Sequence, residues 1–176
     1  TTPTAFGSEL IISEYLEGSS YNKAIELSNM TDETIDLATY SLHKQTNGGG
    51  GWSAGLPLSG EILAGGSFVI ALNSASPELL AMADFASNNT ALSFNGNDPI
   101  ALAKDGALID IVGDFDAGKN NFFGKDKTLV RKAIVSSPNP VFDENEWDVY
   151  PRNTATDLGS HTFGLGKTIK HITRLH

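Results

Sequence analysis

The amino-acid sequence predicts an all-β fold, a sandwich or barrel of short strands with one short crossover helix. Three observations support this fold class. Runs of β-branched and apolar residues recur about every ten residues, turn-forming residues separate them, and only one segment has a helical pattern. The 176 residues are enough for one domain that buries most of its apolar surface.

The expected strands are Glu9–Leu16, Ala24–Ser28, Tyr40–Lys44, Gly51–Pro57, Ser67–Leu72, Ala91–Phe94, Ile100–Lys104, Ala107–Val112, Leu129–Lys132 and Glu146–Tyr150. The clearest pair is the hairpin "IALAKDGALIDIV", where Asp105 and Gly106 can adopt the positive φ angles of a type I′ turn. The crossover helix is expected within Ser74–Ala86, with Ser76 as its cap and Pro77 at its first position.

Charge and composition exclude several classes of function. The formal net charge is -9, so the chain repels a phosphate backbone, and nucleic acid is not the expected partner of this fragment alone. The sequence has no cysteine, which excludes thiol nucleophiles, zinc-thiolate sites and disulfide frameworks. No apolar run approaches the roughly 20 residues of a membrane-spanning helix, and the opening "TTPTAFGSEL" lacks the features of a signal peptide. We therefore expect a soluble chain with no membrane span.

Two carboxylates, Glu14 and Glu26, lie inside the first two expected strands. With the two-residue period of a strand, Glu14 shares a face with Ile12, so it is not separated from apolar neighbours. Two interpretations are open. In the first, the carboxylates are structural: they pair with a basic side chain such as Lys23 or Arg131, or they accept backbone hydrogen bonds at a strand end. In the second, they form an acidic site.

One acidic loop is a candidate calcium site. In "DFDAGKNNFFGKD", Asp114 and Asp116 have the spacing of oxygen ligands, and Asn120 offers a carbonyl oxygen. Calcium takes about six to eight oxygens, and this loop lacks the later bidentate glutamate of a helix-loop-helix calcium site. The alternative is a solvated loop with local side-chain turns. No cofactor is required by the sequence, and calcium is the one it suggests.

Aromatic and basic residues in polar surroundings form a second candidate site. Trp52 follows four glycines, Phe122 and Phe123 lie in a polar loop, and Arg131 and Lys132 are the basic pair in the body of the chain. Exposed aromatic side chains of this kind are typical of interaction surfaces. The predicted binding surface is therefore Trp52, Phe122, Phe123, Arg131 and Lys132.

The segment "LIISEYLEGSSYNKAIELSNMTDETIDLATYSL" resembles the opening of lamin-tail domains, with an Ile-Ser-Glu strand, an Ile-Glu-Leu strand and an Asn-x-Thr turn. Further segments resemble the family in the same order: "GEILAGGSFVIA", "LSFNGNDPIALAKDGALIDIVG", "KTLVRK" and "EWDVYPRNTATDLGSHTF". The resemblance covers about Glu9 to Phe163 and implies an immunoglobulin-like β-sandwich domain over residues 1–163. It also implies that the chain is not an enzyme, because the family carries no catalytic residues.

The later segments are most similar to the module that precedes a metal-dependent endonuclease/exonuclease/phosphatase domain in extracellular bacterial nucleases. This resemblance implies a secreted or cell-surface bacterial protein, in which the module positions or tethers a neighbouring catalytic domain or another protein. The alternative is a module that binds nucleic acid or polysaccharide directly. Residues 164–176, "GLGKTIKHITRLH", carry Lys167, Lys170 and Arg174 and no acid, and are expected to be a basic tail or the start of a linker.

Overall fold

The computed structural model describes residues 6–164 and 169–170. Its strands are β1 (Leu10–Glu17), β2 (Lys23–Asn29), β3 (Ile35–Asp36), β4 (Tyr40–Lys44), β5 (Leu56–Pro57), β6 (Glu61–Ile62), β7 (Ser67–Leu72), β8 (Phe85–Ser87), β9 (Ile100–Lys104), β10 (Ala107–Val112), β11 (Lys127–Arg131), β12 (Trp147–Pro151), β13 (Thr162–Phe163) and β14 (Ile169–Lys170). Its helical elements are the α-helix α1 (Pro77–Met82) and the 3-10 turns η1 (Leu37–Thr39), η2 (Thr46–Gly48), η3 (Thr90–Leu92) and η4 (Glu144–Glu146).

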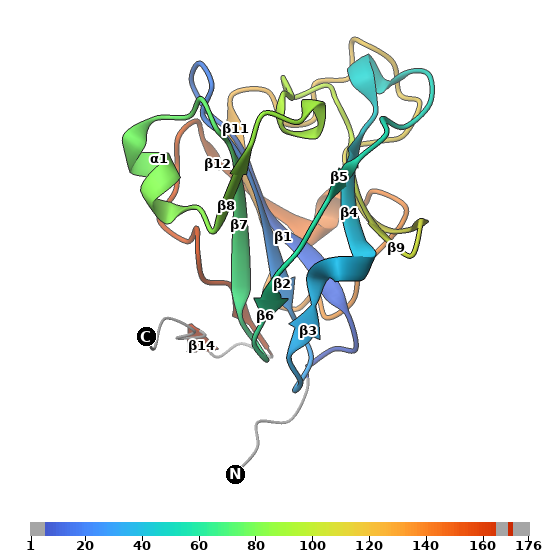
Figure 1. The fold of residues 1–176 in the computed structure, drawn as a ribbon. Coiled ribbons are helices and arrows are strands. Elements are labelled where there is room, and N and C mark those ends of the chain that lie inside the picture. Colours follow the sequence, from blue (N-terminus) through green and yellow to red (C-terminus); the bar gives the residue numbers. More distant parts are fainter. Residues whose placement is uncertain (1–5, 165–168, 171–176) are drawn as a thin grey trace.

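Two sheets pack face to face and confirm the predicted all-β sandwich (Figure 1). One sheet has six strands in the order β12-β11-β1-β2-β7-β8, and the other has four in the order β10-β9-β4-β5. Two short two-stranded sheets, β3-β6 and β13-β14, lie at the margins. β1 and β11 are far apart in the sequence but pair antiparallel. The strands β11 and β12 of the six-stranded sheet therefore follow the strands of the second sheet along the chain.

Two expected strands differ from the structure. Most of Gly51–Pro57 is irregular and only β5 pairs with β4, since the glycines before it favour a loop. The expected strand at Ala91–Phe94 begins as the 3-10 turn η3, because the side chain of Asn89 accepts a hydrogen bond from the N–H of Ala91 and caps that turn. The short strands β3, β6, β8, β13 and β14 were not expected from the sequence.

The hairpin and the start of the helix were predicted correctly from local chemistry, whereas the helix ends at Met82 and Phe85 already belongs to β8. Ser76 caps α1 by accepting a hydrogen bond from the N–H of Leu79, and Pro77 occupies the first helical position. Between β9 and β10, Asp105 and Gly106 have φ angles of 51° and 79°, as a type I′ turn requires. The six-stranded sheet lies between α1 and the four-stranded sheet (Figure 1).

The central strands β1 and β2 of the six-stranded sheet are buried on both faces. The inner face of this sheet packs against the other sheet through side chains such as Tyr15 and Ile25. Its outer face is covered by α1 and by the segment that follows β12, which form a second apolar cluster with Leu16 and Val69. Antiparallel sheets commonly leave one face in water. Here that face is covered, so polar residues on the outer face of β1 and β2 are buried too.

A β-bulge at Ser13 changes the faces that simple alternation predicts for β1. Ile12 pairs with Leu27 and Glu14 pairs with Glu26, so one extra residue of β1 is inserted between these pairs. Ile12 therefore lies in the core between the sheets, and Glu14 lies on the opposite, outer face. The expectation that Ile12 and Glu14 share a face was wrong for this reason.

In the part of the chain that the structure describes, no helix has the length and apolarity to cross a membrane. Of the expected basic tail, 164–176, only Gly164 and the strand β14 fall within the described residues. Lys167 and Arg174 lie outside them.

Candidate interaction surface

A groove lined by aromatic and aliphatic side chains lies on the outer face of the four-stranded sheet. Its volume is about 350 Å³, and its lining residues, here called the aromatic groove, are Trp52, Leu108, Ile111, Asp114, Phe115, Pro140, Val141 and Phe142. A second hollow of about 120 Å³ shares Trp52 and Leu108 and continues onto β4 and β9, with the lining His43, Trp52, Ala101, Ala103, Gly106 and Leu108. The small alanines of β9 leave room beside the indole, which creates this continuation.

The sheet geometry directs the groove side chains outward. β10 pairs with β9 through Leu108 opposite Ala103 and Ile111 opposite Ala101, with a bulge between Leu108 and Asp110. The bulge places Leu108 and Ile111 on the outer face and turns Asp110 to the interior. The floor of the groove is therefore a consequence of one inserted residue in β10.

Two aromatic rings from distant loops form one wall of the groove. Trp52 and Phe115 stack with their ring centroids 5.2 Å apart and their planes inclined by 25°. Phe115 is 48% exposed, and Val141, another lining residue, is 70% exposed. Such contiguous exposed apolar side chains are typical of sites that bind a partner.

The predicted aromatic set is only partly brought together. Trp52 lies in the groove, but its partner is Phe115, which the sequence reasoning missed. Phe123 packs inside against Tyr15, with ring centroids 5.6 Å apart. Phe122 is 44% exposed and lies under the ammonium group of Lys125, away from the groove lining. The "DFD" motif was interpreted only for its carboxylates, although its exposed phenylalanine was the signal for the groove.

Arg131 is buried and does not belong to an exposed binding surface, which corrects its assignment there. Only 1% of the residue is exposed. Its guanidinium nitrogens pair with Asp110 at 3.0 and 3.2 Å and with Glu146 at 2.7 Å. Burial alone would lower the pKa of Arg131, but the two carboxylates raise it, so the side chain is a permanent buried cation. Lys132 is half-buried, and its backbone N–H donates to the carbonyl of Glu146.

The expected pairing of Glu14 and Glu26 with basic residues was also wrong. Lys23 instead forms an ion pair with Glu17, and Arg131 pairs with acids on the other face of the sheet. Glu26 does accept a backbone hydrogen bond, from the N–H of Gly159 at 2.6 Å. The two glutamates are thus direct neighbours, and neither pairs with a cation among the described residues.

The predicted calcium ligands lie on the surface. Asp114 and Asp116 are exposed, as is Asn120. Asp116 exchanges two hydrogen bonds with Gln45: its Oδ1 accepts from the amide nitrogen at 2.6 Å, and its backbone N–H donates to the amide oxygen at 2.9 Å. Within residues 6–164, no group of three or more histidine or acidic side chains is placed to hold a metal ion.

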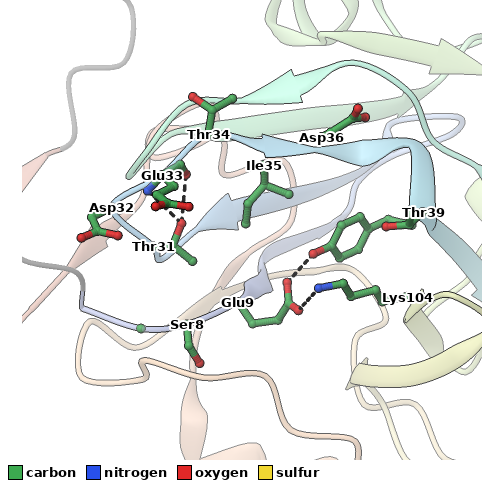
Figure 2. Close-up of a pocket in the computed structure, with 12 residues that line it drawn as sticks. Ser8, Glu9, Thr31, Asp32, Glu33, Thr34, Ile35, Asp36, Thr39 and Lys104 are labelled. Carbon is green, nitrogen blue, oxygen red and sulfur yellow. Dashed lines mark hydrogen bonds and ion pairs between the residues drawn. The ribbon is translucent and has the colours of Figure 1, made fainter.

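A polar pocket of about 550 Å³ lies at one margin of the sandwich, beside β3 (Figure 2). Glu9 accepts a hydrogen bond from the hydroxyl of Tyr40 at 2.5 Å and pairs with Lys104 at 3.0 Å. Burial would raise the pKa of Glu9, but these bonds lower it below its ordinary value. Asp32 and Glu33 are exposed at the rim. The pocket is therefore negatively charged and favours cationic groups.

Comparison with known protein families supports the fold. Residues 3–116, well over half of the chain, match the family model of the lamin tail domain. The match ends before β11 and β12, which nevertheless complete the six-stranded sheet by pairing with β1. No curated protein and no solved structure matches the chain. Lamin tail domains are non-catalytic interaction modules with an immunoglobulin-like fold, and this chain belongs to the lamin tail domain family.

Proposed function

We propose that this domain is an accessory module of a secreted or cell-surface bacterial nuclease-like protein, and that it docks a neighbouring catalytic domain in the aromatic groove. The supporting observation is the groove itself, where Trp52, Phe115 and Val141 expose apolar surface on a domain of net charge -9. The cores of protein interfaces are rich in aromatic and poor in charged side chains. The resemblance of the later segments to nuclease accessory modules supports the identity of the partner.

The electrostatics favour a protein partner over direct binding of nucleic acid. Arg131 is committed to a buried network and offers no contact to phosphate. The groove lining contains a single charged side chain, Asp114, which is negative. A nucleic-acid surface instead needs several accessible cations. The stacked Trp52–Phe115 pair would also suit the flat face of a sugar ring, so polysaccharide binding is the competing function.

Docking through the groove should depend on its two stacked aromatic rings. The gene that encodes this chain should also encode a metal-dependent nuclease domain, which can be produced separately and titrated with this domain by calorimetry. Replacing Trp52 and Phe115 together with alanine should weaken binding at least about 30-fold, because truncated aromatic anchors typically cost about 2 kcal/mol or more.

The matched control for this experiment is Tyr150→Ala on β12, an exposed aromatic residue of the other sheet. It should leave the affinity unchanged. Unaltered binding by the Trp52 and Phe115 variant would exclude the groove as the docking site. If the unchanged domain binds a soluble polysaccharide and the Trp52 and Phe115 variant does not, the groove is a polysaccharide-binding site and not a docking site for a domain.

We further propose that the acidic loop binds a calcium ion, which Asp114, Asp116 and Asn120 coordinate. Extracellular calcium modules have dissociation constants of about 0.1–1 mM. At about tenfold excess over such a constant, binding stabilises the folded state by about 1.4 kcal/mol, or about 3–6 °C in Tm. The measurement is thermal melting in EDTA and then in calcium. Asp114→Asn should abolish the rise, and an equal Tm with and without calcium would leave the loop without a metal.

A further inference from the structure

Two buried carboxyl groups face each other across β1 and β2. Glu14 and Glu26 are direct partners in the antiparallel register, and they are 1% and 0% exposed. Direct cross-strand partners have Cβ atoms about 4.5–5.5 Å apart. Two carboxyl groups are therefore held together inside the domain, on the sheet that does not carry the aromatic groove.

The C-terminal strap, defined as residues 154–163, covers this pair. Leu158 of the strap packs into the outer apolar cluster of the six-stranded sheet. The N–H of Gly159 donates a hydrogen bond of 2.6 Å to Oε2 of Glu26, and both residues are buried. The strap is thus fastened to the sheet through one member of the carboxyl pair.

The charged group from the strap that faces the pair is another acid. Asp157 raises the pKa of both carboxyl groups. The cations Lys23 of β2 and Arg131 of the neighbouring strand β11 are engaged elsewhere, with Glu17 and Asp110 respectively. On the neighbouring strands, the cross-strand partner of Glu26 is Val69 of β7, and that of Glu14 is Val130 of β11. If both glutamates were ionised, two buried negative charges would be adjacent without a counterion, which is strongly unfavourable.

The hydrogen bonds show which member holds the proton. Both oxygens of Glu26 accept a hydrogen bond, one from the hydroxyl of Ser13 at 2.6 Å and one from Gly159. Oε2 of Glu14 is buried with no hydrogen-bond partner among the described residues. Burial, Glu26 and Asp157 raise the pKa of Glu14 to about 9. Burial also raises the pKa of Glu26, to about 7, although its hydrogen bonds oppose this.

A chain of hydroxyl groups leads from the edge of the buried region to Glu26. Ser67, which is half-buried, lies 2.8 Å from Ser28, which lies 2.7 Å from Ser13, whose hydroxyl donates to Glu26. Each hydroxyl can donate one hydrogen bond and accept another. Glu26, the direct neighbour of Glu14, is therefore linked by hydrogen bonds to the edge of the buried region.

We propose that the Glu14–Glu26 pair holds a proton and acts as a latch for the C-terminal strap. The strap stays on the sheet while the pair keeps its proton. When the proton leaves, repulsion between the two carboxylates and Asp157 loosens the strap and uncovers the outer apolar cluster. The latch couples the proton concentration to the attachment of the strap, and it lies on a different sheet from the aromatic groove.

The effect of pH has a definite sign. The ordinary pKa of a glutamate carboxyl is 4.5, so from about pH 4.5 to 9 the native state binds more protons than the unfolded chain. The free energy of unfolding therefore falls as the pH rises through this window. His161 of the strap does not add a charge in its upper part, because burial and Arg131 lower its pKa to about 4. The latch is thus best observed above about pH 6.5.

The test measures the strap directly in the whole chain, by hydrogen exchange with mass spectrometry. From about pH 6.5 to 9, the protection factor of the strap amides should fall at least about tenfold, and the Tm should fall by roughly 5 °C. Glu14→Gln removes the second charge, so its strap protection should change less than about twofold over the same range. The exposed Glu61→Gln on β6 is the control and should behave as the unchanged protein.

Two results would overturn the proposal. One is strap protection in the unchanged protein that does not depend on pH. The other is a Glu14→Gln variant that loses protection as the unchanged protein does. If Glu14→Gln does not fold, NMR titration of the side-chain carboxyl carbons of the unchanged protein decides, because titration of both Glu14 and Glu26 near the ordinary value of 4.5 would exclude a proton held by the pair.

Discussion

Replacing Arg131 with methionine is expected to lower the free energy of unfolding by about 3–5 kcal/mol and the Tm by roughly 10 °C. The guanidinium and the carboxylate of Asp110 are both completely buried. Without the cation, Asp110 remains as an unpaired charge between the two sheets, and this uncompensated charge is the costly outcome. Urea denaturation followed by circular dichroism measures the change.

The loss extends beyond a single ion pair. Arg131 also donates to the carbonyl of Ile12 at 2.9 Å, and its guanidinium lies 4.6 Å from the ring centroid of Trp147. Asp110 in turn accepts hydrogen bonds from the N–H groups of Ile12 and Asn139. The network therefore ties β1, β10 and β11 together where the two sheets meet, and removing its cation weakens all three attachments.

Arg152→Met is the matched control for this substitution. Arg152 also pairs with an aspartate, Asp126, but at 3.5 Å, with both side chains about half exposed. Its replacement should change the stability by no more than about 0.5 kcal/mol. A second variant, Asp110→Asn together with Arg131→Met, should be more stable than Arg131→Met alone. If Arg131→Met costs no more than Arg152→Met, the buried network does not stabilise the domain.

Features with local causes could be predicted from the sequence. The hairpin from Ile100 to Val112 depends on two turn residues and on alternation around them, and both are visible in the printed letters. The cap and the first proline of α1 are equally local. Bulges are different, because an extra residue at Ser13 reverses which face the following residues occupy, and nothing within the strand marks it.

The parts of the candidate site that were missed depend on distant contacts. Arg131 was expected at the surface because arginine is rarely buried without a partner. That partner, Asp110, is 21 residues away and is directed inward by the bulge in β10. Trp52 was singled out from the sequence and lines the groove, but Phe115 lies on another loop, and only the fold stacks the two rings.

Replacing Phe94 with alanine is the second substitution expected to have a large effect, a loss of about 3–5 kcal/mol in the free energy of unfolding. Phe94 is fully buried between the sheets, and its ring stacks on Tyr15 with centroids 4.7 Å apart. The truncation would remove this stacking and leave a cavity that the flanking strands cannot fill by a small movement. Chemical denaturation of the two proteins gives the difference.

The same substitution should also disturb the aromatic groove, because a row of rings connects the two sites. Tyr15 contacts Phe123, and Phe123 contacts Phe142 in the groove wall at a centroid distance of 5.8 Å. Phe122→Ala is the control, since that ring is exposed and its replacement should cost less than about 1 kcal/mol. NMR chemical shifts of the groove residues should therefore change in Phe94→Ala and stay constant in Phe122→Ala. Unchanged groove shifts in a destabilised Phe94→Ala would mean that the core and the groove respond independently.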